Sequence, residues 1–393
     1  MRNDICILCF GISGNGGLER VVCNLANEFC NNDYKVTICV CKGDYENCNY
    51  TLDSRIVFHS FNEILYKNNN FFCRCIGKFF RKTNIKLLYD EIIKKKIYFP
   101  QKRVNLLEEY LEKNNYDSVI AIGCELSILL SCINRRKIKT QLIGWHHNSY
   151  FAYFEEKGKY CCGMSKLAFN SYSNLDKLVL LTKKDQKIYE KNGVKNSTYI
   201  YNPLSFTSDA KSSINNRNII FVGRLEWRQK GLDYFIKIVN EVFKENICDN
   251  WKIIIAGDGP DSKRLKKYIL HKKLNDKIIF LGKVSNIKDY YKKSDILLNT
   301  SRWEGFGLVI TEAMECGVPV ISFDTDGPNE IISNGIDGYL IEKYNINEFS
   351  NRIIELIKDE KKRKQFSIQA IKKANKFKIN KIFEKWEELI QNY

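Results

Sequence analysis

The sequence predicts an α/β protein built from two doubly wound, Rossmann-like domains. Short apolar strands alternate with segments of helical length, and this alternation is typical of a parallel sheet that helices cover on both faces. The alternation stops at Tyr201–Pro203 and begins again at Ile219. A chain of 393 residues is long enough for two such domains. We therefore expect two similar domains that face one another across a cleft.

The first predicted domain spans residues 1–203. A Gly-rich turn, Gly11–Gly17, follows its first strand, and apolar residues at helical spacing follow the turn. Helical patterns such as Val104–Lys113 lie between most of the later strands. The predicted strands are Ile5–Phe10, Val36–Val40, Asp117–Ile122, Gln141–Trp145 and Lys177–Leu181.

The second predicted domain spans residues 204–375. Ser205–Asn218 is rich in Ser, Asn and Asp, which is typical of an interdomain linker. Residues 376–393 form a last helix, with Trp386 and Ile390 on one face, that we expect to pack back toward the first domain. The predicted strands of the second domain are Ile219–Val222, Trp251–Ala256, Lys277–Leu281, Ile296–Asn299 and Val318–Phe323.

The composition limits the partners and the compartment. The chain has 63 Lys and Arg against 46 Asp and Glu, a formal charge of +17, so nucleic acid, an anionic membrane or an anionic substrate all fit. No apolar run reaches the roughly 18–20 residues of a membrane helix, and the first one is too short for a signal peptide. The 15 cysteines lack a zinc-site spacing and indicate reduced thiols in the cytoplasm.

The strongest motif is Arg302–Ala313, which follows a predicted strand and begins a helix. Ligands of open α/β sheets bind at this end of the strands. Gly305 and Gly307 let the backbone come close to a ligand, and the N–H groups at a helix start suit a phosphate. Glu304 can accept hydrogen bonds from sugar hydroxyls. Glu312, about two turns into the predicted helix, would face another part of the same ligand.

Further loops with glycines and charges follow strands of the same predicted sheet. An Arg fork and a Lys point charge that converge at one edge suit a diphosphate, and Arg224 and Lys230 are placed to do so. We therefore predict a nucleotide-diphosphate site at this edge. The loops are Gly223–Leu225 with Lys230–Gly231, Ala256–Pro260 and Gly327–Glu330.

These motifs together resemble the family-4 glycosyltransferases of the GT-B superfamily. The resemblance is dense from Ile219 to about Leu340, in the strings GRL…KG, AGDGP, EGFGLVITEAMECGVPVIS and GPNEII. It implies the GT-B fold and a retaining transfer from a nucleotide sugar. The loop from Arg224 to Lys230 is one residue longer than the family pattern, which leaves Arg228 as an alternative to Lys230.

The first half is similar to the same family more sparsely. Its Gly14–Arg20 string looks like the family's Gly-Gly turn, whose backbone meets the donor diphosphate. Trp145 is followed by two histidines after a strand, where the family has an active-site His. The family places that His two residues after a Trp, so His147 is preferred and His146 is the alternative.

The resemblance implies a role for each of these residues. Arg224 and Lys230 neutralise the leaving diphosphate, Glu304 holds the donor sugar, and His147 contacts the hexose and steers the acceptor. Transfer is a front-face displacement without a protein nucleophile. No metal or other cofactor is expected, and Asp324–Asp326 is read as a turn and not as a metal-binding DxD. The implied donor-binding residues are Gly16, Gly17, Gly223, Arg228, Gly257, Asp258, Phe306, Gly307, Leu308 and Glu312.

The segment 67–103 holds most of the excess positive charge. It has 11 Lys or Arg and two acids, a net charge of 11 − 2 = +9, interleaved with apolar side chains. This pattern is typical of a helix that lies on anionic lipid, although a solvated face around core residues would look similar. We expect a peripheral protein on the inner face of the cell membrane. No nucleic-acid motif accompanies the charge.

The function expected from the sequence is a retaining glycosyltransferase of bacterial cell-surface polysaccharide synthesis, such as that of lipopolysaccharide, O-antigen or capsule. By resemblance, the donor is a UDP-hexose or UDP-N-acetylhexosamine, and we expect the acceptor to be a lipid-linked glycan. The alternatives are a nucleotide-sugar enzyme of the same fold that does not transfer, such as an epimerase, and a degenerate sugar-nucleotide binder.

Overall fold

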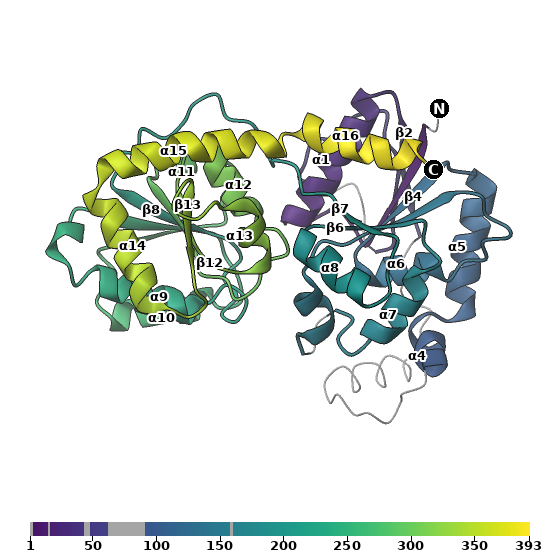
Figure 1. The fold of residues 1–393 in the computed structure, drawn as a ribbon, viewed down its shortest axis with the longest axis horizontal. Helices are drawn as coiled ribbons and strands as arrows, with labels where there is room; N and C mark the ends of the chain where they lie inside the picture. The colour runs from purple at the N-terminus through teal and green to yellow at the C-terminus, as the bar shows by residue number, and fades with distance from the viewer. Residues whose placement is uncertain (1–2, 15, 43–47, 62–90, 158–159) are drawn as a thin grey trace. The chain divides into compact units, whose positions relative to one another are not determined.

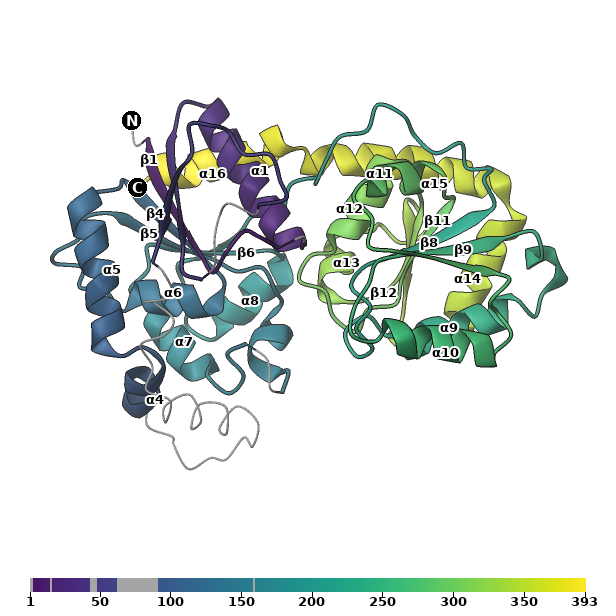
Figure 2. The ribbon, with the colours of Figure 1, turned by 180° about the vertical axis from the view of Figure 1, so that it is seen from behind.

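A computed structural model describes residues 3–14, 16–42, 48–61, 91–157 and 160–393 (Figures 1 and 2). The chain forms two compact units. Unit 1 contains Met1–Pro203 and Ile379–Tyr393, and unit 2 contains Leu204–Lys378. Each unit has its own parallel sheet and its own hydrophobic core. Most of the positively charged segment 67–103, here called the basic segment, lies outside the described residues, because residues 67–90 are not described.

Unit 1 is built on a seven-stranded parallel sheet in the order β3-β2-β1-β4-β5-β6-β7. Its inner strands are buried along nearly their whole length, as expected for strands that helices cover on both faces. The strands are β1 (Asp4–Cys9), β2 (Lys35–Val40), β3 (Val57–Ser60), β4 (Ser118–Ile122), β5 (Gln141–Trp145), β6 (Lys177–Leu180) and β7 (Ser197–Tyr199).

The last helix of the chain belongs to the core of unit 1, beside α1 (Figure 1). The rings of Phe29 and Phe383 lie 5.2 Å apart, and the Trp386 ring lies 4.8 Å from that of Trp145 at the end of β5. The helices of unit 1 are α1 (Gly17–Asn31), α4 (Glu91–Tyr98), α5 (Gln101–Asn114), α6 (Cys124–Ser131), the π-helix η1 (Phe151–Glu155), α7 (Ser165–Tyr172), α8 (Lys183–Lys191) and α16 (Ile379–Gln391).

Unit 2 is built on a six-stranded parallel sheet in the order β10-β9-β8-β11-β12-β13. Its strands are β8 (Asn218–Val222), β9 (Lys252–Ala256), β10 (Ile278–Gly282), β11 (Ile296–Asn299), β12 (Val320–Phe323) and β13 (Gly338–Ile341). Its helices are α9 (Leu232–Val242), η2 (Asn246–Cys248), α10 (Ser262–His271), α11 (Ile287–Lys292), α12 (Leu308–Glu315), α13 (Asp326–Ile331), α14 (Ile346–Lys358), α15 (Glu360–Ala374) and η3 (Asn375–Phe377).

The two parallel sheets confirm the predicted fold class. The sequence missed β3, β7 and β13, which lie at the edges of the sheets. These three strands are only three or four residues long, and β3 and β7 have partly exposed positions, so their apolar pattern is weak. Among the described residues, no helix is long and apolar enough to cross a membrane.

Both sheets change winding direction at one point. In unit 2 the chain moves outward from β8 to β10, then returns to place β11 on the other side of β8. In unit 1 the same change occurs between β1 and β4. Loops that leave the carboxyl ends of the strands diverge at such a switch point and open a crevice for ligands. A ligand site is therefore expected in unit 2 where β8 and β11 end, and another in unit 1 where β1 and β4 end.

Candidate active site

The predicted cation and acid of unit 2 meet at its switch point. Lys230 comes from the loop after β8 and Glu304 from the loop after β11, and Lys230 Nζ lies 2.5 Å from Glu304 Oε1. Ser301 Oγ donates to the same carboxylate oxygen at 2.6 Å. The two charged side chains are 13% and 11% exposed, so the charges are shielded from most of the solvent and attract strongly.

Glycines bring the backbones of the neighbouring loops into contact. Gly231 has φ +59°, and a Cβ there would lie 2.2 Å from the carbonyl oxygen of Thr300. Gly257, at the end of β9, has φ +146°, and a Cβ there would lie 1.9 Å from the carbonyl oxygen of Gly223. No other residue type fits at either position, so these glycines set the spacing of the loops after β8, β9 and β11.

Arg302 holds the loop after β8 in place, and sequence reasoning assigned it no role. Its guanidinium donates to the Arg228 carbonyl oxygen at 2.9 Å and pairs with Asp233 at 2.7 Å. Its backbone N–H donates to the carbonyl oxygen of Gln229 at 2.8 Å. The guanidinium carbon also lies 4.3 Å from the centre of the Tyr234 ring. Arg302 therefore fixes the residues that immediately precede Lys230.

Arg224 and Arg228 lie at the surface of the same loop. The Arg224 side chain is exposed and, within the described ranges, has no hydrogen-bond or ion-pair partner. It is thus available for an anionic ligand. Arg228 is also exposed, but it is Lys230 and not Arg228 that pairs with Glu304. The longer loop therefore still delivers Lys230 to the acid.

Helix α12 begins at this edge, directly after Glu304. Gly307 precedes the helix with φ +102°, Phe306 is buried, and Leu308 is the first helical residue. The first N–H groups of a helix have no acceptor within the helix and favour an anion. A Cβ on Gly327, at the start of α13, would lie 2.2 Å from the Phe306 carbonyl oxygen.

Glu312 lies deeper than the sequence suggested. Helix α12 starts at Leu308, so Glu312 stands just beyond its first turn and not two turns in. Its side chain is buried and accepts a hydrogen bond from the Tyr291 hydroxyl at 3.1 Å. Tyr291 comes from α11 and is itself buried. Glu312 and Glu304 therefore occupy separate environments.

Two acidic stretches serve local structure at this edge. Asp258 accepts from the Gly259 N–H at 2.8 Å and closes the turn after β9. In the string Asp324–Asp326, Asp324 accepts from the Asn329 side chain at 2.8 Å and Asp326 begins α13. Among the described residues, no group of three or more His, Cys, Asp or Glu is arranged to hold a metal ion.

The Gly-rich turn of unit 1 precedes α1 at the other switch point. Gly16 directly precedes the helix, which begins at Gly17. A Cβ on Gly16 would lie 2.5 Å from Glu19 Oε2, so the first-turn carboxylate folds back over the turn. The Tyr50 hydroxyl donates to the Gly16 carbonyl oxygen at 3.1 Å. The turn is thus held from both sides within unit 1.

The two histidines after β5 have different surroundings. His146 is fully buried, and its two ring nitrogens lie 3.0 Å from the Tyr189 hydroxyl and 3.2 Å from the Tyr172 hydroxyl. His146 is therefore a core residue. The His147 ring packs 4.2 Å from that of Trp145, and its Nε2 has no hydrogen-bond partner among the described residues.

Burial lowers the pKa of both histidines to about 3, so both rings are neutral near pH 7. The backbone N–H of His147 donates to the hydroxyl of Tyr153 at 3.0 Å. Tyr153 belongs to the π-helix η1, a distortion that is frequent near functional sites. The structure thus leaves a His147 ring nitrogen without a hydrogen-bond partner among the described residues, whereas tyrosine hydroxyls engage both ring nitrogens of His146.

Known proteins match this chain over unit 2 and over its whole length. Residues 207–373 match the family described as "Glycosyl transferases group 1". The amylovoran biosynthesis glycosyltransferase AmsD of Erwinia amylovora is 26% identical over 402 residues, which cover 98% of each chain. A Campylobacter jejuni α-1,4-N-acetyl-D-galactosaminyltransferase, named for the acceptor GalNAc-α-(1→4)-GalNAc-α-(1→3)-diNAcBac-PP-undecaprenol, is 28% identical over 381 residues, 96% of this chain and 95% of the relative.

The fold is also that of solved glycosyltransferases. A Staphylococcus aureus TarM mutant in complex with fondaparinux, α-GlcNAc-glycerol and UDP superposes with a TM-score of 0.76 at 19% identity, and the match covers 99% of this chain and 100% of TarM. Unit 2 therefore carries the group 1 (family-4) glycosyltransferase domain, the full-length relatives are glycosyltransferases, and the chain has the GT-B fold of the solved enzymes.

Proposed function

We propose that this enzyme transfers a hexose or an N-acetylhexosamine from a UDP-sugar to a lipid-linked glycan during bacterial surface-polysaccharide synthesis. The observation that carries the proposal is the meeting of Lys230 and Glu304 at the switch point of unit 2, beside the start of α12. An acid for sugar hydroxyls and a cation for the diphosphate are thereby adjacent, as a nucleotide sugar requires.

The diphosphate is held by charge from two directions. Arg224 is exposed and offers a planar fork, Lys230 offers a point charge, and the N–H groups at Gly307 and Leu308 point outward from α12. These groups gain most in the transition state, where negative charge grows on the leaving phosphate. One preorganised donor of this kind is worth roughly 3–4 kcal/mol of barrier in well-studied enzymes.

The sugar is transferred on the face from which the diphosphate leaves. The bond between the anomeric carbon and the β-phosphate oxygen breaks, the acceptor oxygen bonds to that carbon, and the acceptor proton passes to the leaving phosphate. Glu304 orients the sugar and is not the nucleophile, because Lys230 and Ser301 already engage its carboxylate. His147 contacts the hexose through its neutral ring.

The comparisons support the choice of donor and acceptor. TarM was solved with UDP, and the Campylobacter relative is named for an undecaprenol-linked acceptor. With a lipid-linked acceptor, the proposed reaction takes place at the inner face of the cell membrane. The basic segment 67–103 fits that surface by its charge. Its described part includes α4, where Lys95 is half-buried and Lys96 is exposed.

The donor and the reaction are tested together. UDP-, GDP- and ADP-sugars are compared by thermal shift, since a ligand of the folded state raises its stability. Release of nucleoside diphosphate is then measured with and without an undecaprenyl-diphosphate-linked glycan. We expect a UDP-sugar to stabilise the protein and UDP release to depend on the acceptor. If the enzyme converts the donor whether or not the acceptor is present, an epimerase-like enzyme is favoured. If it binds the donor without converting it, a degenerate binder is favoured.

Membrane binding is tested with vesicles of phosphatidylglycerol and phosphatidylethanolamine at low salt. We expect these vesicles to capture the protein and vesicles of phosphatidylcholine alone not to. Changing Lys94, Lys95 and Lys96 to Glu should release it, because each cation near the surface is worth about 1 kcal/mol. The matched control changes Lys263, Lys266 and Lys267 of α10 to Glu. Equal capture of both triple variants would refute the membrane role of the basic segment.

A further inference from the structure

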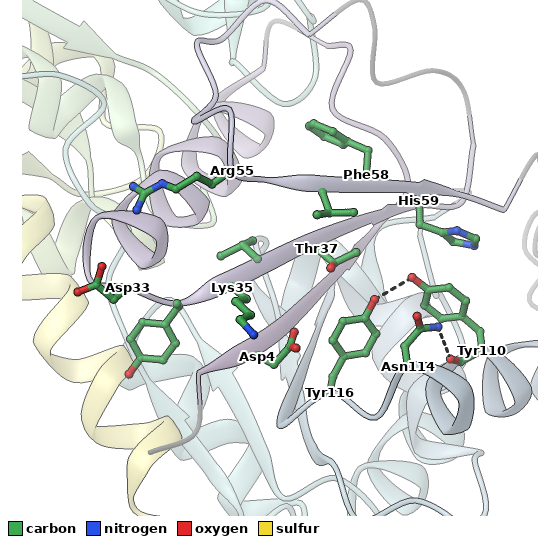
Figure 3. Close-up of a pocket in the computed structure, with 13 residues that line it drawn as sticks. Asp4, Asp33, Lys35, Thr37, Arg55, Phe58, His59, Tyr110, Asn114 and Tyr116 are labelled. Atoms are coloured by element: carbon green, nitrogen blue, oxygen red, sulfur yellow. Dashed lines mark hydrogen bonds between the residues drawn. The ribbon is translucent and has the colours of Figure 1, made fainter.

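Unit 1 has a cavity far from the Gly-rich turn and from His147. Its volume is about 550 Å³, and Figure 3 shows it at the strands β1, β2 and β3. Asp4, Lys35 and Val57 are the first residues of these strands, so the cavity opens at the amino edge of the sheet. The Gly-rich turn and His147 follow carboxyl ends, a strand length of roughly 17 Å away at about 3.3 Å per residue.

Aromatic rings and hydroxyls line this cavity. His59 stacks on Tyr110 with ring centres 4.2 Å apart and an interplanar angle of 25°. The Tyr110 hydroxyl lies 2.9 Å from that of Tyr116, and the two point toward one another below β2 and β3 (Figure 3). Tyr34 and Phe58 complete the aromatic lining. The cavity wall is therefore rich in aromatic rings, and the hydroxyls of Tyr110 and Tyr116 are among its polar groups.

The charged residues around the cavity do not favour an anion. Two acids, Asp4 and Asp33, stand against two cations, Lys35 and Arg55. The Arg55 guanidinium is engaged by Asp53 through two hydrogen bonds of 2.9 and 2.8 Å. With Arg55 held by Asp53, two acids stand against Lys35 alone, which makes a phosphate a poor ligand.

Polar atoms remain available to a neutral ligand. Within the described ranges, the Asp4 carboxylate and the His59 ring nitrogens have no hydrogen-bond partner. Asn114 uses its amide N–H toward the Tyr110 carbonyl oxygen, which leaves its side-chain oxygen as an acceptor. Carboxylate and amide oxygens accept from the hydroxyls of a sugar, while ring faces pack against its C–H face.

We propose that this cavity binds a neutral sugar unit of the growing glycan, several sugars away from the one that receives the transferred residue. The ligand class rests on the proposed function, because a glycosyltransferase meets a polyhydroxylated chain in its acceptor. Its position at the amino edge makes it a second subsite, separate from the reacting end of that chain. Such a subsite favours longer acceptors over shorter ones by adding binding energy remote from the reaction.

The test measures binding to the full-length protein without any donor. An array of neutral hexose and N-acetylhexosamine oligosaccharides is screened, and the best ligand is titrated by calorimetry. Asp4→Asn removes the carboxylate, and Val57→Arg places a long side chain at the cavity mouth, where Val57 is 59% exposed. The controls are Asp209→Asn and Ile279→Arg, the latter on the edge strand β10 of unit 2, where Ile279 is 46% exposed.

We expect an oligosaccharide to bind, and both cavity variants to weaken its binding about tenfold or more. Asp4→Asn loses a charge-assisted hydrogen bond, and Val57→Arg obstructs the cavity mouth. The controls should bind like the wild type, and all four variants should keep its thermal midpoint. Binding to no glycan on the array, or equal binding by the cavity variants and the controls, would overturn the proposal. An enzyme that binds glycans here but transfers to none would instead contradict the proposed function.

Discussion

The ammonium group of Lys230 lies 2.5 Å from carboxylate oxygen Oε1 of Glu304, although 74 residues separate them in the chain. The two loops that carry them follow β8 and β11, the strands on either side of the switch point of unit 2. Fold topology therefore couples the group for the diphosphate to the group for the sugar. A change at one residue must alter the electrostatics of the other.

Replacing Glu304 by Gln should abolish transfer while the protein stays folded. The amide keeps the shape of the side chain but loses the charge that holds Lys230 and the sugar hydroxyls. We expect kcat/KM to fall at least 100-fold, which corresponds to about 2.7 kcal/mol of transition-state stabilisation. Steady-state UDP release measures it, with Glu241→Gln as the control, because Glu241 pairs with Lys244 at 2.7 Å outside the site. Full activity of the Glu304 variant would refute the site.

Arg302 is expected to act as a positioning residue for Lys230. Arg302→Lys keeps a positive charge but cannot bond Asp233 and the Arg228 carbonyl as Arg302 does. We expect kcat to fall about tenfold or more, from a misplaced cation, with little change in thermal midpoint.

Arg352→Lys is the matched control for Arg302. Arg352 pairs with Glu355 at 2.9 Å and lies over the Tyr339 ring at 4.8 Å, but it belongs to α14. Both variants lose a comparable ion pair and ring contact. If the two variants lose the same activity, the positioning role of Arg302 is wrong.

Much of this site could be predicted because its residues share the carboxyl edge of one sheet. The motifs after β8, β9 and β11 place Arg224, Gly257 and Glu304 there as soon as the strands are recognised. The role of Arg302 could not be predicted, since it depends on contacts with Asp233 and the Arg228 carbonyl that exist only in the folded unit. The one signal in the sequence was that a cation, Arg302, begins the glycine-containing motif Arg302–Ala313.

The two histidines show the same limit. His146 and His147 are adjacent at a strand end, and only the family's spacing after a Trp favours His147. The tyrosines that enclose His146, Tyr172 and Tyr189, come from α7 and α8 and lie 26 and 43 residues further along the chain. Short edge strands such as β3 were missed for a related reason, because half-buried residues give little alternation in hydropathy.

Burial of His146 should make the stability of the protein depend on pH. Its pKa is about 3 in the folded protein against about 6.5 when unfolded. The unfolded chain therefore binds the extra proton between these values, and stability is lost as pH falls from about 6.5 toward 3. The slope is about 1.4 kcal/mol per pH unit for one such group.

Urea unfolding between pH 4.5 and 6.5 measures this contribution. In His146→Gln we expect the slope of unfolding free energy against pH to decrease by about one proton equivalent. His271→Gln is the control, since His271 lies at the end of α10. An unchanged slope in the His146 variant would show that His146 is not held neutral in the folded protein.

Transfer should not require a divalent metal. Arg224, Lys230 and the start of α12 supply the positive charge that a metal ion would otherwise provide to the diphosphate. We expect UDP release after EDTA treatment and dialysis to stay within about twofold of the untreated enzyme, a change worth less than about 0.5 kcal/mol. Loss of activity that Mg²⁺ or Mn²⁺ restores would contradict this and give Asp324–Asp326 a metal-binding role.

The most direct test of the nucleotide site is calorimetric titration of UDP into the wild type, Lys230→Met, Arg224→Met and Lys263→Met. Lys263 is exposed on α10 and controls for net charge. We expect Lys230→Met and Arg224→Met each to weaken UDP binding at least tenfold, about 1.4 kcal/mol, and Lys263→Met to bind like the wild type. Equal affinity of all four proteins would show that the nucleotide diphosphate does not bind at the switch point of unit 2.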